Sequence, residues 1–284
     1  MAEPQTRSVG ELLAFGIAEL GASSSPLLDA EVLLAEVTAV GRAALVANPN
    51  SNVDLAQEAQ FRQFIAKRRA GVPVAYLLGR KEFWSLNLQV TPHTLIPRPE
   101  TELLVEKALE IARQENIGAI ADLGTGCGAI ALALAVECPT ARVVGVDISE
   151  NAVTVAKRNA VRLGIVNTQF VYSDWYSAFS GQRFELIIAN PPYIANGDPA
   201  LTSGSIHHEP RKALIGGADG LLAIRQIIDG AGNHLRPGGW LMLEHGNKQA
   251  EAVHQLLAIQ RFSSVTTFAD LAGHPRVSAG VLAS

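Results

Sequence analysis

The chain has few cysteines, no excess of basic residues and no long apolar run, and each of these absences excludes a class of protein. Cys127 and Cys138 are its only cysteines, and neither has other metal-binding residues at a useful spacing. We therefore expect neither a disulfide framework nor a metal site. The 23 Lys and Arg against 27 Asp and Glu give a formal net charge of −4. Because phosphate binding relies on concentrated basic residues, we expect no nucleic acid as a direct substrate.

No uninterrupted apolar run approaches the roughly 18 residues that a membrane-spanning helix requires, so we expect no membrane association. The first residues, Met-Ala-Glu-Pro-Gln-Thr-Arg, lack the charged and then apolar order of a signal peptide. These two features predict a cytoplasmic protein. Apolar residues make up 48% and charged residues 18% of the 284 residues, as in ordinary globular proteins, and this length suffices for two domains.

The pattern of apolar residues changes twice along the chain and predicts three regions. Residues 1–80 carry apolar side chains at helical spacing, and we expect a small helical bundle domain that serves substrate recognition. Residues 81–99 alternate apolar and polar residues between prolines, which predicts a β-hairpin linker. Residues 100–284 form the third region, in which helices and strands alternate.

The alternation in the third region indicates a mostly parallel sheet with helices on both faces, which is the α/β class. We expect the helices near residues 101–114, 129–137, 149–163, 219–235 and 248–259. We expect the strands near residues 119–123, 142–146, 168–172, 185–189, 240–244, 264–268 and 277–282.

A glycine-rich loop follows the first strand of this sheet and precedes a helix. Glycines let the backbone turn sharply and approach a ligand at the carboxyl edge of the sheet. The next strand ends at Asp147, whose carboxylate can accept hydrogen bonds from both hydroxyls of a ribose. The loop and the acid together predict a cofactor that contains adenosine. The loop consists of Gly124, Thr125, Gly126, Cys127 and Gly128.

Glycine spacing alone leaves the cofactor open, because residues 124–129 also match the looser fingerprint of dinucleotide-binding proteins. Asp122 lies just before the loop, where its carboxylate would repel a pyrophosphate but attract the ammonium group of a methionine moiety, directly or through water. This favours S-adenosylmethionine. At the third strand edge, Asp174 offers an acceptor for an adenine amino group. Trp175 either packs against the adenine ring or belongs to the core.

The stretch Asn190-Pro191-Pro192-Tyr193 follows the apolar run 185–189 and so lies where a buried strand ends. Asn-Pro alone often marks an ordinary turn. Here the prolines hold the backbone rigid, so that an Asn side chain and the adjacent carbonyls can point at a ligand. We expect the Asn190 oxygen and the Pro191 carbonyl to accept both hydrogens of a planar NH2 group, with Tyr193 against its plane. These two hydrogen bonds would orient the nitrogen toward a methyl donor.

These segments resemble the motifs of class I S-adenosylmethionine-dependent methyltransferases that modify planar NH2 groups, which have a Rossmann-like fold. Other segments and the helical N-terminal domain narrow the resemblance. Along essentially the whole chain, they resemble the HemK/PrmC-type peptide chain release factor glutamine N5-methyltransferases. The further segments that carry this resemblance are residues 95–102, 173–175, 209–210, 213–217, 243–246, 270–273 and 276–277.

The resemblance implies methylation of the glutamine in the Gly-Gly-Gln motif of class I peptide chain release factors, which affects translation termination. S-adenosylmethionine would be the donor and S-adenosylhomocysteine the product. Residues 190–193 would hold the glutamine amide. The residues implied to contact the cofactor are Gly124 to Gly128, Asp147, Trp175 and Asn190.

Two other functions stay open on the residues alone. An adenine N6-methyltransferase acting on DNA or RNA shares the Asn-Pro-Pro-Tyr motif and would flip its target base into the site. The net acidity and the lack of a dense basic stripe argue against it. A non-catalytic adenosine-binding protein would keep the crevice only as a ligand switch, and the intact Asn190 and Tyr193 argue against that.

Overall fold

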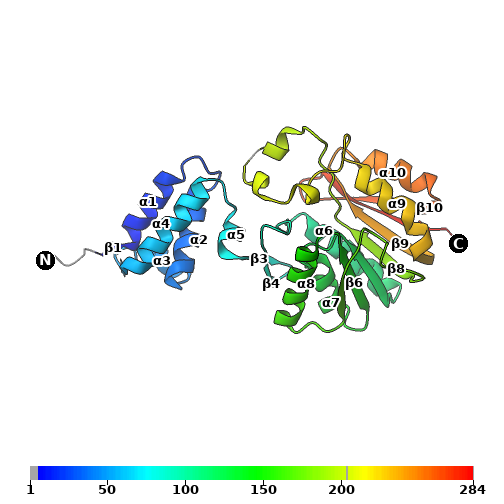
Figure 1. The fold of residues 1–284 in the computed structure, drawn as a ribbon, viewed down its shortest axis with the longest axis horizontal. Coiled ribbons are helices and arrows are strands. Elements are labelled where there is room, and N and C mark those ends of the chain that lie inside the picture. The colour runs from blue at the N-terminus through cyan, green and yellow to red at the C-terminus, as the bar shows by residue number, and fades with distance from the viewer. Residues whose placement is uncertain (1–5, 203, 284) are drawn as a thin grey trace. The chain divides into compact units, whose positions relative to one another are not determined.

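The computed structural model describes residues 6–202 and 204–283 (Figure 1). Residues 1–5, which carry most of the expectation about a signal peptide, lie outside the described residues. Across the described ranges, no helix combines the length and the apolar character needed to cross a membrane.

Contacts divide the chain into two compact units. The helical N-terminal residues form most of the first unit, and the predicted hairpin groups with the second unit rather than standing apart as a linker. The first unit comprises residues 1–79 and 202–208, and the second comprises residues 80–201 and 209–284.

The first unit is the helical bundle that the sequence predicts. Apolar side chains at helical spacing, among them Leu12, Leu33 and Phe61, are fully buried in its core. Ser8 begins the first helix with a capping box: its hydroxyl accepts from the Glu11 N–H, and the Glu11 carboxylate accepts from the Ser8 N–H at 2.8 Å. The elements are β1 (Arg7–Ser8), α1 (Val9–Glu19), α2 (Pro26–Thr38), α3 (Arg42–Ala47), β2 (Asn52–Val53), α4 (Leu55–Arg69) and α5 (Val74–Leu78).

Residues 202–208 belong to the first unit by their contacts, although they come much later in the chain. The Nε2 atom of His208 lies 3.2 Å from the carbonyl oxygen of Ala70. A Cβ atom at Gly71 would lie 3.1 Å from both the His207 and the His208 ring. The absence of a side chain at Gly71 therefore makes room for the two histidines.

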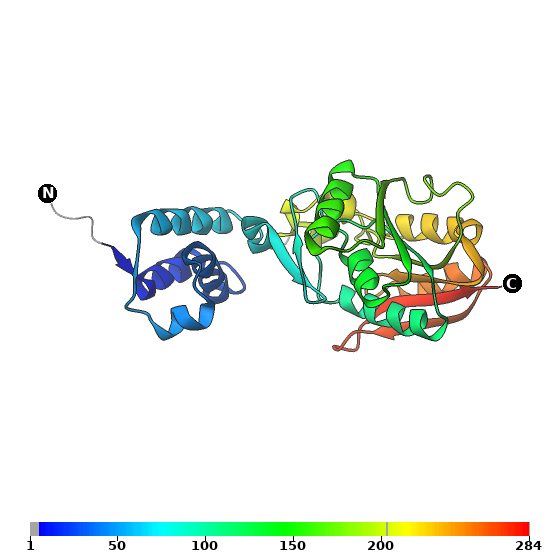
Figure 2. The same cartoon turned by 90° about the horizontal axis from the view of Figure 1, so that it is seen from below.

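The second unit is built on a seven-stranded sheet. Its strands are β5 (Ala119–Leu123), β6 (Arg142–Asp147), β7 (Thr168–Tyr172), β8 (Phe184–Ala189), β9 (Leu235–Glu244), β10 (Phe262–Ala269) and β11 (Pro275–Leu282). Their order is β10-β11-β9-β8-β5-β6-β7. The five strands from β9 to β7 are parallel, and β11 and β10 are antiparallel and close one edge (Figure 2). The order reverses between β5 and β8, where open α/β sheets bind ligands.

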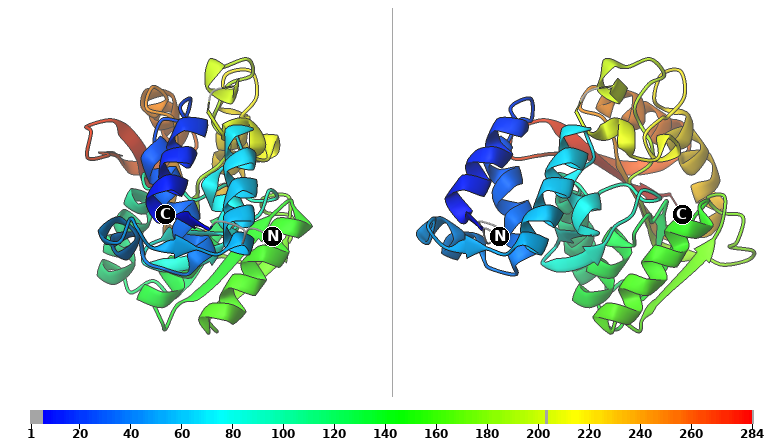
Figure 3. Two further views of the ribbon diagram at one scale, coloured as in Figure 1. Left: turned by 90° about the vertical axis from the view of Figure 1, so that its left-hand side faces the viewer. Right: turned by 60° about the vertical axis from the view of Figure 1, so that its left-hand side comes forward.

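Helices cover both faces of this sheet, so the predicted α/β class with a helical N-terminal region is confirmed (Figures 1 and 3). On one face, buried side chains such as Val144, Ile187 and Leu241 pack with two helices, α9 (Leu222–His234) and α10 (Ala250–Ile259). The other face carries α6 (Thr101–Gln114), α7 (Ala129–Glu137) and α8 (Glu150–Leu163).

The predicted hairpin consists of β3 (Arg80–Phe83) and β4 (Leu86–Gln89). Its turn residues Trp84 and Ser85 have φ of 50° and 58°, the left-handed conformation that a two-residue hairpin turn requires. Asn159 of α8 is fully buried and accepts from the Gln89 N–H at 2.7 Å. Its NH2 group donates to the carbonyls of Gln89 and Cys127. One buried amide therefore joins the hairpin to the glycine-rich loop.

Candidate active site at the carboxyl edge of the sheet

The strand register brings the predicted site residues to one edge of the sheet. Leu123 pairs with Val146 on one side and with Ala189 on the other. Asp147 and Asn190, which follow these two partners, therefore flank the glycine-rich loop that follows Leu123. The three segments meet at the topological switch point between β5 and β8.

The glycine-rich loop is held by hydrogen bonds to the neighbouring strand. The N–H groups of Gly124 and Thr125 both donate to the Val146 carbonyl at 2.8 Å, and the Gly126 N–H donates to Asp147 Oδ2 at 2.9 Å. Gly126 has a left-handed φ of 57°, and no atom lies within 4 Å of the position that its Cβ would take. Its backbone therefore faces open space, into which a ligand can fit closely.

Asp122 lies beneath the loop and is fully buried. Its Oδ2 accepts from the Thr125 hydroxyl at 2.6 Å and from the Ala131 N–H at 3.2 Å. Its Oδ1 is buried without a hydrogen-bond partner among the described residues. Burial raises the pKa of Asp122 to about 7. The carboxyl thus braces the loop and keeps one acceptor unused, and its attraction for an ammonium group stays a prediction.

Asp147 is half-buried at the end of β6. Besides the Gly126 N–H, it accepts from the Ser149 N–H through Oδ1 at 2.8 Å. Burial raises its pKa above the ordinary value, and these two backbone bonds act in the opposite direction. Each carboxylate oxygen can accept two hydrogen bonds, so both oxygens retain capacity for ribose hydroxyls.

Cys127 is 2% exposed, and burial raises the pKa of its thiol to about 12. The thiol is therefore neutral and inert, and the carbonyl of Cys127 accepts from the buried Asn159 side chain. Over the described ranges, no group of three or more His, Cys, Asp and Glu side chains forms a metal site.

Trp175 lies between the loop and the core. Its indole N–H donates to Gln226 Oε1 at 3.0 Å, and its ring is 3.6 Å from the Cβ position of Gly124. The ring also packs against the buried cluster beneath α9. Asp174 is exposed beside it. The Trp175 ring therefore serves the core on one side and borders the glycine-rich loop on the other.

The motif 190–193 follows β8, and the side chain of its first residue is held by a hydrogen bond. The NH2 group of Asn190 donates to the Thr101 hydroxyl at 3.0 Å, which leaves Oδ1 as a free acceptor among the described residues. Pro191 is buried and Pro192 is half-buried. The Tyr193 hydroxyl donates to Glu244 Oε1 at 3.3 Å, and burial raises the pKa of this phenol.

Glu244 is a site residue to which sequence reasoning assigned no role. Leu243 pairs with Ala189, so Glu244 at the end of β9 lies beside Asn190. Its side chain is almost fully buried, and burial raises its pKa to about 7. An acid directly after an apolar strand is the signal that identified Asp147, and it occurs here too.

The loop after the motif packs closely against it. The Gly216 N–H donates to the Ile194 carbonyl at 2.9 Å, in a short parallel pairing. A Cβ at Gly216 would lie 2.5 Å from the Pro192 carbonyl oxygen, and a Cβ at Gly220 would lie 2.3 Å from that of Tyr193. The backbone of the motif therefore leaves no room for a side chain at either glycine.

A second buried acid, Glu209, joins two segments that the resemblance singles out. It is 4% exposed, accepts from the Ile96 N–H at 3.0 Å and pairs with Arg98. Because a buried carboxylate requires such partners, this contact fixes the segment that leads into α6 and Thr101.

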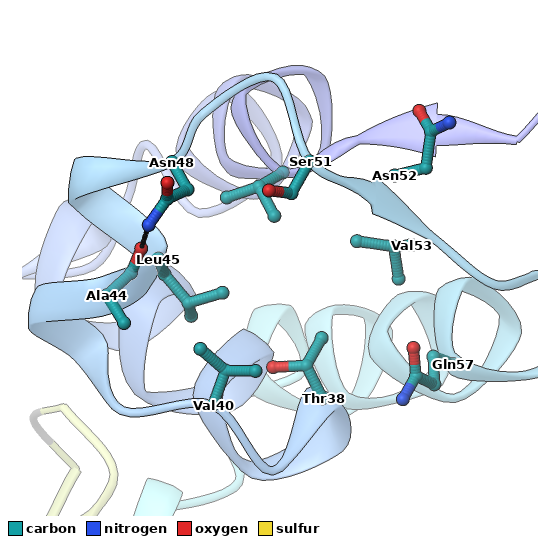
Figure 4. Close-up of a pocket in the computed structure, with 10 residues that line it drawn as sticks. Thr38, Val40, Ala44, Leu45, Asn48, Ser51, Asn52, Val53 and Gln57 are labelled. Atoms are coloured by element: carbon teal, nitrogen blue, oxygen red, sulfur yellow. Dashed lines mark hydrogen bonds between the residues drawn. The ribbon is translucent and has the colours of Figure 1, made fainter.

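A cavity of about 190 Å³ lies within the first unit (Figure 4). No charged side chain and no histidine or cysteine lines it, and the close-up shows Asn48 bonded to the Ala44 carbonyl at its wall. The cavity lacks the groups that acid, base or methyl-transfer chemistry would use, so we assign it no catalytic role. Its lining residues are Val9, Thr38, Val40, Ala44, Leu45, Asn48, Ser51, Asn52, Val53 and Gln57.

Comparisons with known proteins point to one family. Residues 99–214 match the model of the methyltransferase small domain, and residues 11–79 match that of the PrmC N-terminal domain. A "release factor glutamine methyltransferase" of Vibrio cholerae is 47% identical over 91% of this chain and 90% of its own. A protein of the same name from Pseudomonas aeruginosa is 48% identical over 92% of this chain and 95% of its own.

A solved structure is similar to this chain in fold. The 16S rRNA N2 G1207 methyltransferase RsmC of T. thermophilus, in complex with AdoMet and guanosine, matches with a TM-score of 0.53. The match covers 71% of this chain and 49% of that chain at 22% identity. At this identity the likeness concerns the fold alone.

Proposed function

Because the chain belongs to the family of release factor glutamine methyltransferases, we propose that it methylates the side-chain amide nitrogen, N5, of a glutamine. The acceptor is the glutamine of the Gly-Gly-Gln motif in class I peptide chain release factors. The observation that carries this proposal is the orientation of Asn190. Its NH2 group is engaged by Thr101, so its oxygen is left to accept from a primary amide.

The proposed donor is S-adenosylmethionine, which carries a methyl group on a positively charged sulfur. The residues at the sheet edge suit it. Open space at Gly126 admits a ligand against the backbone, and Asp147 keeps lone pairs for ribose hydroxyls. The unpartnered Oδ1 of Asp122 offers a negative site for the ammonium group, directly or through water. Asp174 would accept from the adenine amino group, and Trp175 would border the ring.

The chain's contribution to the chemistry is to orient a weak nucleophile. An amide nitrogen is weak because its lone pair is delocalised into the carbonyl. The Asn190 oxygen and the Pro191 carbonyl would accept both amide hydrogens, and Pro192 and Tyr193 would border the amide plane. Positioning of this kind can lower a barrier by roughly 7 to 11 kcal/mol. Acceptors directed at the nitrogen also stabilise its developing positive charge.

No general base is needed in this scheme. The nitrogen lone pair would form the new nitrogen–carbon bond as the sulfur–carbon bond of the donor breaks, and the electron pair of the broken bond would stay on sulfur. The resulting amide cation is strongly acidic and loses a proton to water. Tyr193 stays neutral, since its pKa is raised by burial, and acts by packing rather than by proton transfer.

The helical first unit would recognise the release factor, and S-adenosylhomocysteine would leave the second unit as product. We place the reaction in the cytoplasm because its acceptor works in translation. Recognition is the role we propose for residues 1–80, of which residues 11–79 match the PrmC N-terminal domain.

Transfer of labelled methyl from S-adenosylmethionine tests the proposal. The acceptors are a purified class I release factor, the same factor with the Gly-Gly-Gln glutamine changed to alanine, duplex DNA and ribosomal RNA. We expect label only on the intact factor. Label on nucleic acid alone would overturn the substrate, and no label on any acceptor would overturn the activity.

A further inference from the structure

The motif 190–193 has one end that the sheet holds and one end that lies beyond the sheet. Asn190 directly follows β8, whose last residue, Ala189, is paired on both sides. Tyr193 lies past the end of this strand, and the chain after it forms a single isolated bridge. The position of Tyr193 therefore depends on contacts other than those of the sheet.

Gln249, at the start of α10, supplies such a contact. Its NH2 group donates to the Tyr193 carbonyl at 3.1 Å and, more weakly, to the Asp219 carbonyl at 3.4 Å. Its Oε1 accepts from the Gly246 N–H at 2.8 Å. The orientation of the amide is fixed, because carbonyls only accept and an N–H only donates. One half-buried side chain thus connects the motif to the loop before α9 and to the turn before α10.

The turn that carries Gln249 is itself anchored to the sheet. His245 is fully buried, and its backbone N–H donates to the Arg276 carbonyl of β11 at 2.9 Å. Its Nδ1–H donates to the Gly246 carbonyl at 2.9 Å, and its Nε2 lies 2.9 Å from the buried Ser278 hydroxyl. Gln249 therefore extends from a turn that β11 holds in place.

Residues 244–249 contact both ends of Tyr193. Glu244 accepts from its hydroxyl at 3.3 Å, and Gln249 donates to its carbonyl. Gly220 leaves the space for the second contact, since a Cβ there would lie 2.7 Å from Gln249 Nε2. The Gln249 amide thus occupies room that a side chain at Gly220 would fill.

We propose that Gln249 is a positioning residue for methyl transfer, which holds the Tyr193 carbonyl and thereby sets the place of the Pro191 carbonyl toward the acceptor amide. This inference rests on the proposed function. Pro191 and Pro192 have restricted φ, so a shift at Tyr193 passes to the Pro191 carbonyl instead of being absorbed between them. Both ends of the Gln249 amide are engaged by the chain, so it acts on the rate through Tyr193 and not on the substrate itself.

The test compares Gln249→Met and Gln249→Glu in methyl transfer to the intact release factor. Methionine has nearly the length of glutamine but lacks its amide, whereas glutamate keeps the acceptor for Gly246 and loses the NH2 donor. Gln255→Met and Gln255→Glu, at an exposed position of α10, are the matched controls. Thermal unfolding and affinity for S-adenosylmethionine are measured for each variant, so that loss of folded protein is recognised.

We expect Gln249→Met to lower kcat roughly 10-fold, with little change in KM for the release factor or in cofactor affinity. A misplacement of about 1 Å costs roughly 100-fold, and the other contacts of the motif limit the shift. Gln249→Glu should be at least as slow at pH 8, because its carboxylate faces two carbonyl oxygens. At pH 5.5 part of this carboxylate is protonated and can donate again. The kcat of Gln249→Glu relative to Gln249→Met should therefore rise as the pH falls, and the Gln255 variants should match the wild type.

Equal kcat in the wild type and in Gln249→Met would overturn the inference. A kcat ratio of the two Gln249 variants that stays constant with pH would do the same, as would an equal loss in the Gln255 variants. A wild type that does not methylate the factor refutes the proposed function, and the inference falls with it. A wild type that does so, beside an equally fast Gln249→Met, refutes the inference alone.

Discussion

Replacement of Gly220 by alanine is expected to slow methyl transfer by moving the backbone of the motif. A Cβ there would lie 2.3 Å from the Tyr193 carbonyl oxygen, and ordinary contacts begin at 3.4 Å. The motif or the loop must therefore shift by about 1 Å. A misplacement of that size at a reacting group can cost roughly 100-fold in rate.

Gly197→Ala provides a matched control in the same loop. Gly197 and Gly220 have φ of 79° and 77°, so alanine meets the same backbone strain at both, roughly 1 to 2 kcal/mol. No atom lies within 4 Å of the Cβ position at Gly197. A Cβ at Gly220 would also lie 2.7 Å from Gln249 Nε2, which donates to the Tyr193 carbonyl. The difference between the two variants therefore isolates the clash with this hydrogen-bonded pair, which we expect to add roughly 1 to 3 kcal/mol of destabilisation.

The assay combines thermal unfolding, calorimetry with S-adenosylmethionine and single-turnover methyl transfer. Gly197→Ala should lose a few degrees in Tm and keep its rate. Gly220→Ala should melt lower and react roughly 100-fold more slowly, with cofactor affinity nearly unchanged. If the two variants react at the same rate, the close packing of Gly220 on the motif does not position the acceptor.

Three further variants test individual residues. Asn190→Ala should leave cofactor affinity nearly intact but lower turnover roughly 100-fold; near-normal turnover would remove Asn190 from the mechanism. Asp147→Ala should weaken cofactor binding, because it removes charge-assisted hydrogen bonds worth roughly 1.5 to 3 kcal/mol each, and an unchanged Kd by calorimetry would contradict this. Burial raises the pKa of Asp122 to about 7 in the folded protein. Between about pH 4 and pH 7 the unfolded chain therefore loses this proton while the folded protein keeps it, so the free energy of unfolding should decrease as the pH rises through this range. Asp122→Asn lacks this contribution. Its free energy of unfolding, measured with denaturant, should therefore differ less between pH 5 and pH 8 than that of the wild type. An equal pH dependence in both proteins would refute the raised pKa.

The sheet and its helices could be predicted closely because each is encoded by a local pattern. The limits of β5, α6 and α7 agree with the expected ones to the residue. Helix α9 begins at Leu222 rather than near residue 219, since the glycines before it are used to pack against the motif. The short α3, α5 and the β1–β2 pair were not predicted, because elements of two to six residues carry too little periodicity.

The candidate site was predictable where a residue follows its own strand. Asp147 and Asn190 are examples, since an apolar run identifies the strand end that carries each. The contact between Asn190 and Thr101 joins residues 89 apart, and only the sheet order and the placement of α6 create it. A local pattern marks Glu244 as an acid at a strand end, but only the register of β8 with β9 shows that it lies beside Asn190. The cofactor and substrate roles of the predicted residues remain predictions for the variants above.

The composition of the first unit has a consequence for how this chain can be divided. Residues 202–208 belong to that unit, so the chain passes between the units three times rather than once. A shortened chain that begins at Arg80 would leave His208 without the Ala70 carbonyl beside it. The helical unit is therefore not a detachable N-terminal module. An insertion or deletion between the motif and α9 would have to preserve the packing of both units, which ties the length of this loop to a domain encoded far upstream.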